Sequence, residues 1–466
     1  MPQSLLEIIF IIVLTLALAY FLVRQKWVKD IGLPSIQIQG LFVIKVCAGI
    51  FLAIFYEIYY GSRVTSDAFR FYDDALIIFE SLKTNPKTYF QIVFGLNMSD
   101  TDVVAVIDKL NTWYKVHGHG VFNDNQTMIR FNALLLPFSQ GYYHVHTVVI
   151  AFLSFTGFLA IIKVFQKFKE LPKWMIYGII LFPQVIFWSS GVLKEGFLFF
   201  CFGWFLYFLF KIYEGDWSKK TMLGTVFFLY LSLLIKTYVI FSLIPGITIL
   251  LASIFLPRLK SPLVFGALWI TLLGLVIMGD SFRGNQRARS IYQKQHDFIN
   301  EAKSVNAGSF FETFVLEPNW KSVIRNSPEA FFNSITRPMP WNANNLISKM
   351  ASVENVLVLL LFLIPMIFFK KPDQNQMVFI LFSTSFVLIM FTLIGLVTPV
   401  AGALVRYKIP GIPFVLFTIY LLTDWQKLFG FFKLSRKKGE SIISILYFLF
   451  NLYLMIHNSK KLCLKK

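Results

Sequence analysis

The sequence predicts an all-α polytopic integral membrane protein with about 11–13 transmembrane helices and two large external loops. Of its 466 residues, 56% are apolar and only 15% are charged, and the mean hydropathy is +0.64. Soluble domains contain about 45–50% apolar and about 25% charged residues. Apolar runs of about 17–25 residues, the length that a helix needs to cross a bilayer, also recur from end to end. Lipid is therefore the expected solvent.

The apolar runs divide the chain into six regions. We expect two transmembrane helices in 1–60, a first external loop with interfacial helices in 61–142, and transmembrane helices 3–8 in 143–279. A second external loop follows in 280–350, then transmembrane helices 9–12 in 351–457 and a basic tail in 458–466. The twelve candidate spans lie near 4–23, 41–60, 143–162, 174–189, 195–213, 221–235, 237–256, 262–279, 352–369, 376–397, 410–423 and 441–457.

The basic residues predict the orientation of these spans. One set of short loops between spans carries 19 of the 44 Lys and Arg residues, and such loops remain in the cytoplasm. The intervening set contains both long polar segments, which we place outside. Scarce cysteine, Lys-rich cytoplasmic loops and no cleavable signal peptide suit a multi-pass protein of the bacterial plasma (inner) membrane. The net charge of +19 fits topology and anionic lipid headgroups better than nucleic acid.

Several function classes find no support in the sequence. Cys47 and Cys201 lie in apolar spans and Cys463 in the tail, so neither a disulfide framework nor a thiolate metal site is expected. The chain has no Walker-type or GxGxxG phosphate loop, which argues against ATP-driven transport by this chain alone. We expect no metal and no cofactor.

The first candidate site begins where the second span ends, at Ser66-Asp67-Ala-Phe-Arg70-Phe-Tyr72-Asp73-Asp74. On a helix, Asp67, Arg70 and Asp74 share one face. A carboxylate at the water–lipid boundary can act as a general base if burial raises its pKa toward the working pH. Alternatively, Ser66 or Asp67 caps a helix whose solvated face carries an Arg70–Asp74 pair.

Three other polar stretches lie at the predicted external boundary. Lys194 and Glu195 follow a Ser-Ser-Gly break, and an opened helix start beside a lysine can bind phosphate, although the two residues can also neutralise each other. Two prolines fix the backbone that follows Arg337, and Trp341 comes directly after them, with a flat ring that can stack on a sugar or isoprenoid. A short turn carries the last group, in which bases outside the membrane suggest an anionic ligand: Arg406, Tyr407 and Lys408.

The stretch Ser66-Asp67-Ala-Phe-Arg-Phe-Tyr72 resembles the (G/S)-D-A-x-x-Y signature of the C-type (GT-C) superfamily of polytopic membrane glycosyltransferases, with three residues instead of two between its Ala and Tyr. The stretches around Lys194, Arg337 and Arg406 look like elements of bacterial envelope-polysaccharide membrane proteins. The resemblance implies that Asp67 is the catalytic base and Tyr72 a nearby shaping residue. It also implies a polyprenyl-phosphate-linked sugar donor. From this sequence we expect no soluble C-terminal domain after the spans, which departs from the commonest pattern.

Three functions are compatible with these features. The first is an inverting hexosyl- or pentosyltransferase that moves a sugar from the lipid-linked donor to a glycan or lipid-linked acceptor hydroxyl at the outer face of the membrane, in cell-envelope glycan assembly. In that reaction Asp67 would take the proton while Lys194, Arg337, Arg406 or Lys408 stabilises the departing phosphate. The second is a Wzy-like or EpsG-like polysaccharide polymerase, in which the arginines matter more than Asp67. The third is a lipid-linked glycan transporter or flippase.

Overall fold

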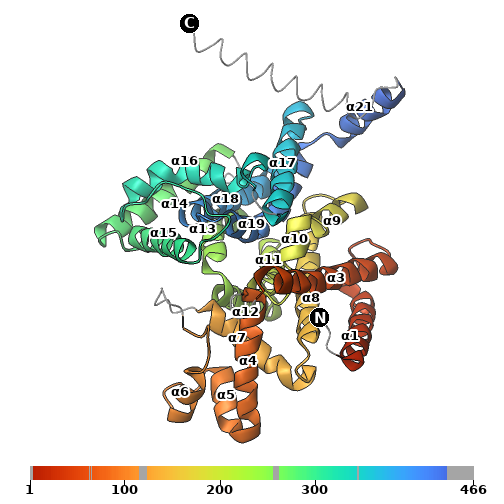
Figure 1. The fold of residues 1–466 in the computed structure, drawn as a ribbon. Coiled ribbons are helices and arrows are strands. Elements are labelled where there is room, and N and C mark those ends of the chain that lie inside the picture. The colour runs from red at the N-terminus through yellow and green to blue at the C-terminus, as the bar shows by residue number, and fades with distance from the viewer. Residues whose placement is uncertain are drawn as a thin grey trace.

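The computed structural model describes residues 4–61, 63, 66–114, 123–255, 262–343 and 346–437. These residues form helices and no β-strand (Figure 1). The helices of the N-terminal half are α1 (Leu5–Arg24), α2 (Lys26–Lys29), α3 (Ser35–Tyr60), α4 (Asp67–Thr84), α5 (Pro86–Phe94), α6 (Thr101–Ile107), α7 (Asp124–Ser139), α8 (Tyr143–Gln166), α9 (Lys173–Ile180), α10 (Pro183–Trp188), α11 (Lys194–Tyr213) and α12 (Lys219–Ile235). Those of the C-terminal half are α13 (Thr237–Phe255), α14 (Pro262–Phe282), α15 (Gln286–Ser304), α16 (Trp320–Thr336), η2 (Pro340–Asn342), α17 (Leu346–Ile367), α18 (Gln374–Val397), α19 (Ala401–Tyr407), η3 (Ile409–Gly411), α20 (Ile412–Leu422) and α21 (Trp425–Lys437).

The predicted all-α polytopic class is confirmed. Within the described residues, nine helical segments are long and apolar enough to cross a membrane. They correspond to nine of the twelve predicted spans. Of the other three, 174–189 is divided into α9 and α10, because Pro183 begins a new helix and disfavours helical backbone in the residue before it. The span at 221–235 lies in α12, which has only 17 residues, and 441–457 lies outside the described residues.

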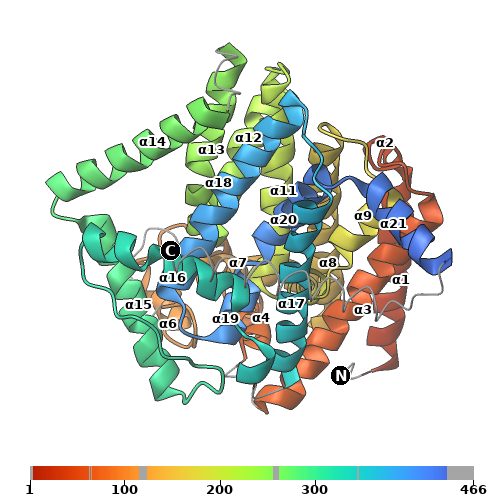
Figure 2. The ribbon, with the colours of Figure 1, turned by 90° about the horizontal axis from the view of Figure 1, so that it is seen from above.

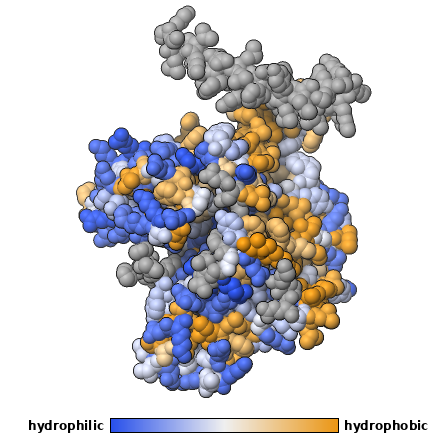
Figure 3. Space-filling model, in the orientation of Figure 1, coloured by the Kyte–Doolittle hydropathy of each residue, from blue (hydrophilic) through white to orange (hydrophobic). Residues whose placement is uncertain are grey.

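Both segments predicted to be large loops contain helices. The first, 61–142, holds α4 to α7, and the second, 280–350, holds α15, α16 and η2. Figure 2 shows α4, α6, α15, α16 and α19 gathered at one end of the long helices. In the view of Figure 3, hydrophilic residues gather over α15 and α16, whereas hydrophobic residues cover α17 and α3. The two segments therefore lie over the same end of the helix bundle.

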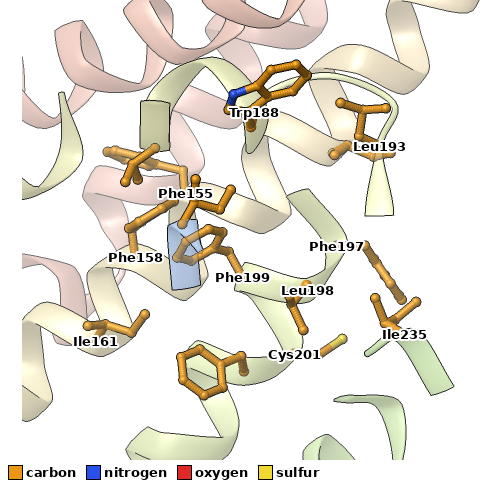
Figure 4. Packing of buried hydrophobic residues seen from close by; sticks show 14 of the residues in the cluster. Phe155, Phe158, Ile161, Trp188, Leu193, Phe197, Leu198, Phe199, Cys201 and Ile235 are labelled. Carbon is orange, nitrogen blue, oxygen red and sulfur yellow. The ribbon is translucent and has the colours of Figure 1, made fainter. Parts of the chain in front are cut away.

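The centre of the bundle is built from aromatic side chains of α8 and α11. Phe155, Phe158 and Phe199 are fully buried, and the rings of Phe158 and Phe199 stack with centroids 4.2 Å apart. Figure 4 shows these residues together with Trp188, the last residue of α10, and Leu193, the N-cap residue of α11. This packing fixes the start of α11 against the rest of the bundle.

Two glycines allow α8 and α11 to touch through their backbones. A Cβ atom at Gly157 would lie 2.0 Å from the Phe199 carbonyl oxygen, and one at Gly203 would lie 2.2 Å from the Gly157 carbonyl oxygen. Small residues permit such close approach between membrane helices. We expect Gly157→Ala to destabilise the protein by about 1–3 kcal/mol through overpacking, measured as a lower melting temperature in detergent.

The control for this substitution is Gly178→Ala in α9, where no atom lies within 4 Å of the added methyl group. Because alanine favours a helix interior over glycine, this variant should be neutral or slightly more stable. Equal effects of the two substitutions would contradict the role assigned to the α8–α11 contact.

Candidate functional site

Asp67 is the first residue of α4 and follows the buried N-cap residue Ser66. A carboxylate at this position interacts favourably with the helix dipole. One carboxylate oxygen pairs with Arg70 one turn later, and the other lies 2.9 Å from Nη1 of Arg406, a residue 339 positions away in the chain. The side chains of Asp67 and Arg70 remain 36% and 34% exposed, whereas that of Arg406 is 10% exposed.

Arg406 lies in the short helix α19 and connects Asp67 to a buried acid. Its Nη2 is 2.8 Å from Oε2 of Glu195, whose side chain is only 1% exposed. Glu195 also lies 3.5 Å from Nζ of Lys236, at the end of α12. Among the described residues, no acceptor bonds the buried Nε of Arg406. The guanidinium is therefore fixed by two carboxylates and retains one N–H donor.

A second ion pair lies at the start of α11, next to Glu195. Lys194 Nζ is 2.8 Å from Oδ2 of Asp124 and donates to the side-chain oxygen of Asn125 over 2.5 Å. The ammonium also lies 5.0 Å from the ring centre of Phe71 in α4. Residues of α4, α7 and α11 thus meet at this point.

Aromatic rings close one side of the group. Lys236 Nζ lies 4.2 Å from the ring centre of Tyr407, a favourable cation–π distance. Tyr407 in turn contacts Phe298 of α15 edge-on, with ring centroids 6.3 Å apart. Through this contact, the second large loop segment reaches the charged group. We name the following seven residues the ion-pair cluster: Asp67, Arg70, Asp124, Lys194, Glu195, Lys236 and Arg406.

The ion-pair cluster favours anions. Its four basic side chains outnumber its three carboxylates. Burial of the Asp67 carboxyl alone would raise its pKa, but the charges of Arg406, Arg70 and Lys194 outweigh burial and hold the pKa well below its ordinary value. The condition under which Asp67 was predicted to act as a base, a pKa raised by burial, is therefore not met by these contacts. Asp67 is a carboxylate at any physiological pH.

The lowered pKa of Asp67 makes the stability of the fold depend on pH. Because the pKa of Asp67 is lower in the folded chain than in the unfolded chain, the carboxylate stabilises the fold at pH values above its unfolded pKa of about 3.9. That contribution is lost as the pH falls through the folded-state pKa.

Replacing Arg70 should move this titration. We expect Arg70→Gln to raise the pKa of Asp67, because it removes one of the charges that stabilise the carboxylate. Acid unfolding of the purified protein should therefore begin at a higher pH. The control is Arg63→Gln, since Arg63 pairs with Asp73 over 2.6 Å. A shift of equal size in both variants would contradict the assignment to Asp67.

Lys408 belongs to a different polar group. Its side chain is 3% exposed, and Nζ donates to Asn355 Oδ1 over 2.5 Å and to the Ser334 carbonyl over 3.2 Å. Asn355 also donates to the Pro338 carbonyl over 3.0 Å. Lys408 therefore ties α19 to α16, α17 and the turn that carries Arg337.

Arg337 and Trp341 do not join the ion-pair cluster by any described contact. Arg337 Nε donates to Asn333 over 2.9 Å, and its guanidinium lies 4.3 Å from the ring centre of Phe311. No carboxylate within the described ranges forms an ion pair with it. Trp341, in η2, is 75% exposed. Arg337 thus provides a cation, and Trp341 an exposed ring, in the turn that Asn355 links to Lys408.

Asp74 and Tyr72 have structural surroundings. Asp74 is fully buried and accepts backbone N–H bonds from Asn111 over 2.9 Å and Thr112 over 2.8 Å. Tyr72 donates to the Gly141 carbonyl over 2.5 Å. The predicted shared face of Asp67, Arg70 and Asp74 is only partly correct, because Asp67 and Arg70 pair while Asp74 faces the 111–112 backbone.

Two further expectations need correction. Lys194 and Glu195 do not neutralise each other, because adjacent residues at a helix start point in different directions and each finds another partner. Arg406 and Lys408 were expected on a short external turn, but the structure has a helix, α19, at this position. Both are buried, one in α19 and the other at its C-cap.

Sequence reasoning noted Lys236 as an external lysine beside Tyr238 without making it a site residue, and it did not select Asp124 or Asn355. Lys236 directly follows an apolar run and Asp124 opens a short helix, so each sits where a predicted segment changes. A charged residue at such a boundary can be recognised in the sequence, but the sequence does not show with which residue it forms an ion pair. Asn355 lies inside an apolar span, where a polar residue is by default a functional candidate.

Comparisons with known proteins name no relative of this chain. No protein-family model matches it, and searches of curated proteins and of solved structures returned no significant match.

Proposed function

We propose that the protein is a membrane glycosyltransferase that moves a sugar from a polyprenyl-phosphate-linked donor to an acceptor hydroxyl at the outer face of a bacterial plasma membrane. The observation that carries the proposal is the contact between Asp67 and Arg406. It places an accessible carboxylate within 2.9 Å of a buried guanidinium, at the end of the bundle covered by both large loop segments. A proton acceptor and a phosphate-binding group thus lie side by side.

The chemistry needs both groups. The acceptor oxygen attacks the anomeric carbon while its proton passes to the Asp67 carboxylate. The bond between the anomeric carbon and the phosphate oxygen breaks, and its electrons remain on the phosphate. Arg406, with Lys194 and Lys236 nearby, stabilises that negative charge, which is largest as the bond breaks. Displacement in one step inverts the anomeric centre.

Phosphate binding also explains how Asp67 becomes a useful base. The guanidinium of Arg406 lowers the pKa of Asp67. A donor phosphate that takes the Nη1 donor of Arg406 removes this contact from Asp67. The pKa of the carboxyl then rises toward the range in which a general base works best. Without a donor, the ion pair with Arg406 keeps Asp67 a weak base. Donor binding breaks this ion pair and makes Asp67 a stronger base.

A polysaccharide polymerase is the second candidate, and one observation favours it. Asp67 in its present contacts is a weak base, because its pKa lies below the ordinary range, while Arg406 is buried and held by two acids. If the phosphate-binding groups alone drive the reaction, the cations should matter more than Asp67.

Cells carrying Asp67→Asn or Arg406→Lys separate the two candidates. Arg406→Lys keeps a charge near Glu195 but loses the bidentate fork. For the transferase we expect Asp67→Asn to stop the addition of one sugar, seen by mass spectrometry of the lipid-linked glycans. For the polymerase we expect Asp67→Asn to be nearly silent and Arg406→Lys to leave single repeat units unjoined. Membrane levels of both variants are measured alongside.

A further inference from the structure

A groove with a separate chemistry lies where α14 meets α15. Its walls are Leu272, Leu275, Val276 and Gly279 of α14, and its end is formed by Arg283 and Arg287. Its volume is about 340 Å³. The groove therefore has apolar residues along its walls and two guanidinium groups at one end.

The apolar wall faces away from the protein. Only 6% of the α14 span is buried inside the fold, and Leu275 is 61% exposed. Figure 2 shows α14 diverging from α13 toward its C-terminal end. The 21 residues of α14 extend about 31 Å, which matches the hydrocarbon thickness of a bilayer. Acyl chains are therefore the natural cover for this wall.

The two arginines are available to an anion. Asp280, in the last turn of α14, accepts the backbone N–H groups of Arg287 over 3.0 Å and Ala288 over 3.3 Å and the indole N–H of Trp320 over 2.8 Å. In the described part of the chain, neither Arg283 nor Arg287 forms an ion pair. Asp280 thus fixes the corner between the helices through backbone and indole N–H bonds, and its charge interacts with that of Arg287 without a close ion pair.

We propose that this groove binds an anionic phospholipid of the surrounding bilayer. The phosphodiester of the headgroup pairs with Arg283 and Arg287 at the end of α14, where headgroups lie, and an acyl chain follows the apolar wall. Arginine suits this role because its fork binds two phosphate oxygens at once. The bound lipid fills the space beside α14 and fixes the corner that leads into α15.

The groove is distinct from the ion-pair cluster. Arg287 and Phe298, which contacts Tyr407, are 11 residues apart on α15, or about 16 Å along the helix axis. The occupant is therefore a bilayer lipid and not the reacting donor. This separation makes the inference independent of the proposed transferase activity.

Native mass spectrometry of the purified full-length protein tests the proposal. In detergent with added phosphatidylglycerol, we expect one tightly retained lipid on the wild type and on Arg289→Gln, a matched exposed arginine outside the groove. The double variant Arg283→Gln/Arg287→Gln should bind about 30-fold more weakly, since each basic residue near the surface contributes about a factor of five. The variant Arg283→Lys/Arg287→Lys should retain part of the affinity.

Competing ligands decide the class of occupant. Phosphatidylcholine, which has no net charge, should bind weakly to all variants, and inorganic phosphate alone should not displace the lipid. The proposal is overturned if the double Gln variant binds phosphatidylglycerol like the wild type, or if phosphatidylcholine binds equally well. Preferential binding of a polyprenyl phosphate would also overturn it, since the groove would then belong to the substrate path.

Discussion

Arg406→Ala should be among the most destabilising single substitutions in the ion-pair cluster, with an expected cost of about 3–5 kcal/mol in the free energy of unfolding. The substitution leaves Glu195, which is 1% exposed, with only Lys236 at 3.5 Å. A buried carboxylate that loses its main partner keeps the full cost of desolvation. The measurement is the melting temperature of the purified protein in detergent, together with its level in membranes.

A double variant distinguishes a lost ion pair from lost packing. In Arg406→Gln/Glu195→Gln both charges are absent, so we expect it to recover much of the stability that Arg406→Ala loses. The recovery should not extend to activity, since the phosphate-binding group is gone. Arg289→Ala, at an exposed position of α15, serves as the surface control. Equal stability of Arg406→Ala and Arg289→Ala would contradict the structural role of the Arg406–Glu195 pair.

The membrane class could be predicted from the sequence because hydropathy is a sum over many residues. A run of about 20 apolar residues remains a span whatever its neighbours are, so α1, α8 and α18 were expected close to their observed positions. The exceptions follow from local effects. Pro183 divides one expected span into two short helices. Helix α12 has only 17 residues and is shorter than the helices that are long enough to cross a membrane.

Which residues touch could not be predicted, because contacts depend on how helices far apart in sequence pack. Asp67 and Arg406 were both selected as candidates, yet nothing in a single sequence pairs residues 339 positions apart. The helical face predicted for Asp67 and Arg70 was correct since it depends only on i, i+3 spacing. Asp74 was assigned to that group by the same spacing, but the 111–112 backbone, which folds over α4, takes its carboxylate.

The direction of the pKa shift at Asp67 could not be predicted for the same reason, because it depends on basic residues that helix packing brings together. Only burial and one basic neighbour, Arg70 at i+3, were visible from the sequence, and burial by itself raises the pKa of a carboxyl. Three basic residues from α4, α11 and α19 reverse that effect. The ion-pair cluster is therefore better described as an anion site that contains a carboxylate than as an isolated acid with a raised pKa.

Asp67→Asn should lower the rate of sugar transfer by about 10²–10⁴-fold, the range expected for loss of a general base. The amide keeps the size of the side chain and can still accept a bond from Arg406, but it cannot take the proton of the acceptor hydroxyl. The rate is measured with the full-length protein in membranes, using the donor and acceptor identified from the glycan that Asp67→Asn cells fail to extend.

Asp73→Asn provides the matched control for this loss of rate. It is the same chemical change on the same helix, at a residue that pairs with Arg63 and not with Arg406. We expect it to leave the rate within about twofold, because surface substitutions rarely change a free energy by more than about 0.5 kcal/mol. Asp67→Glu should fall between the two, since it retains a base but displaces it from Arg406. If Asp67→Asn and Asp73→Asn keep the same rate while Arg406→Lys abolishes it, Asp67 serves to hold Arg406 in place and the cations carry the reaction.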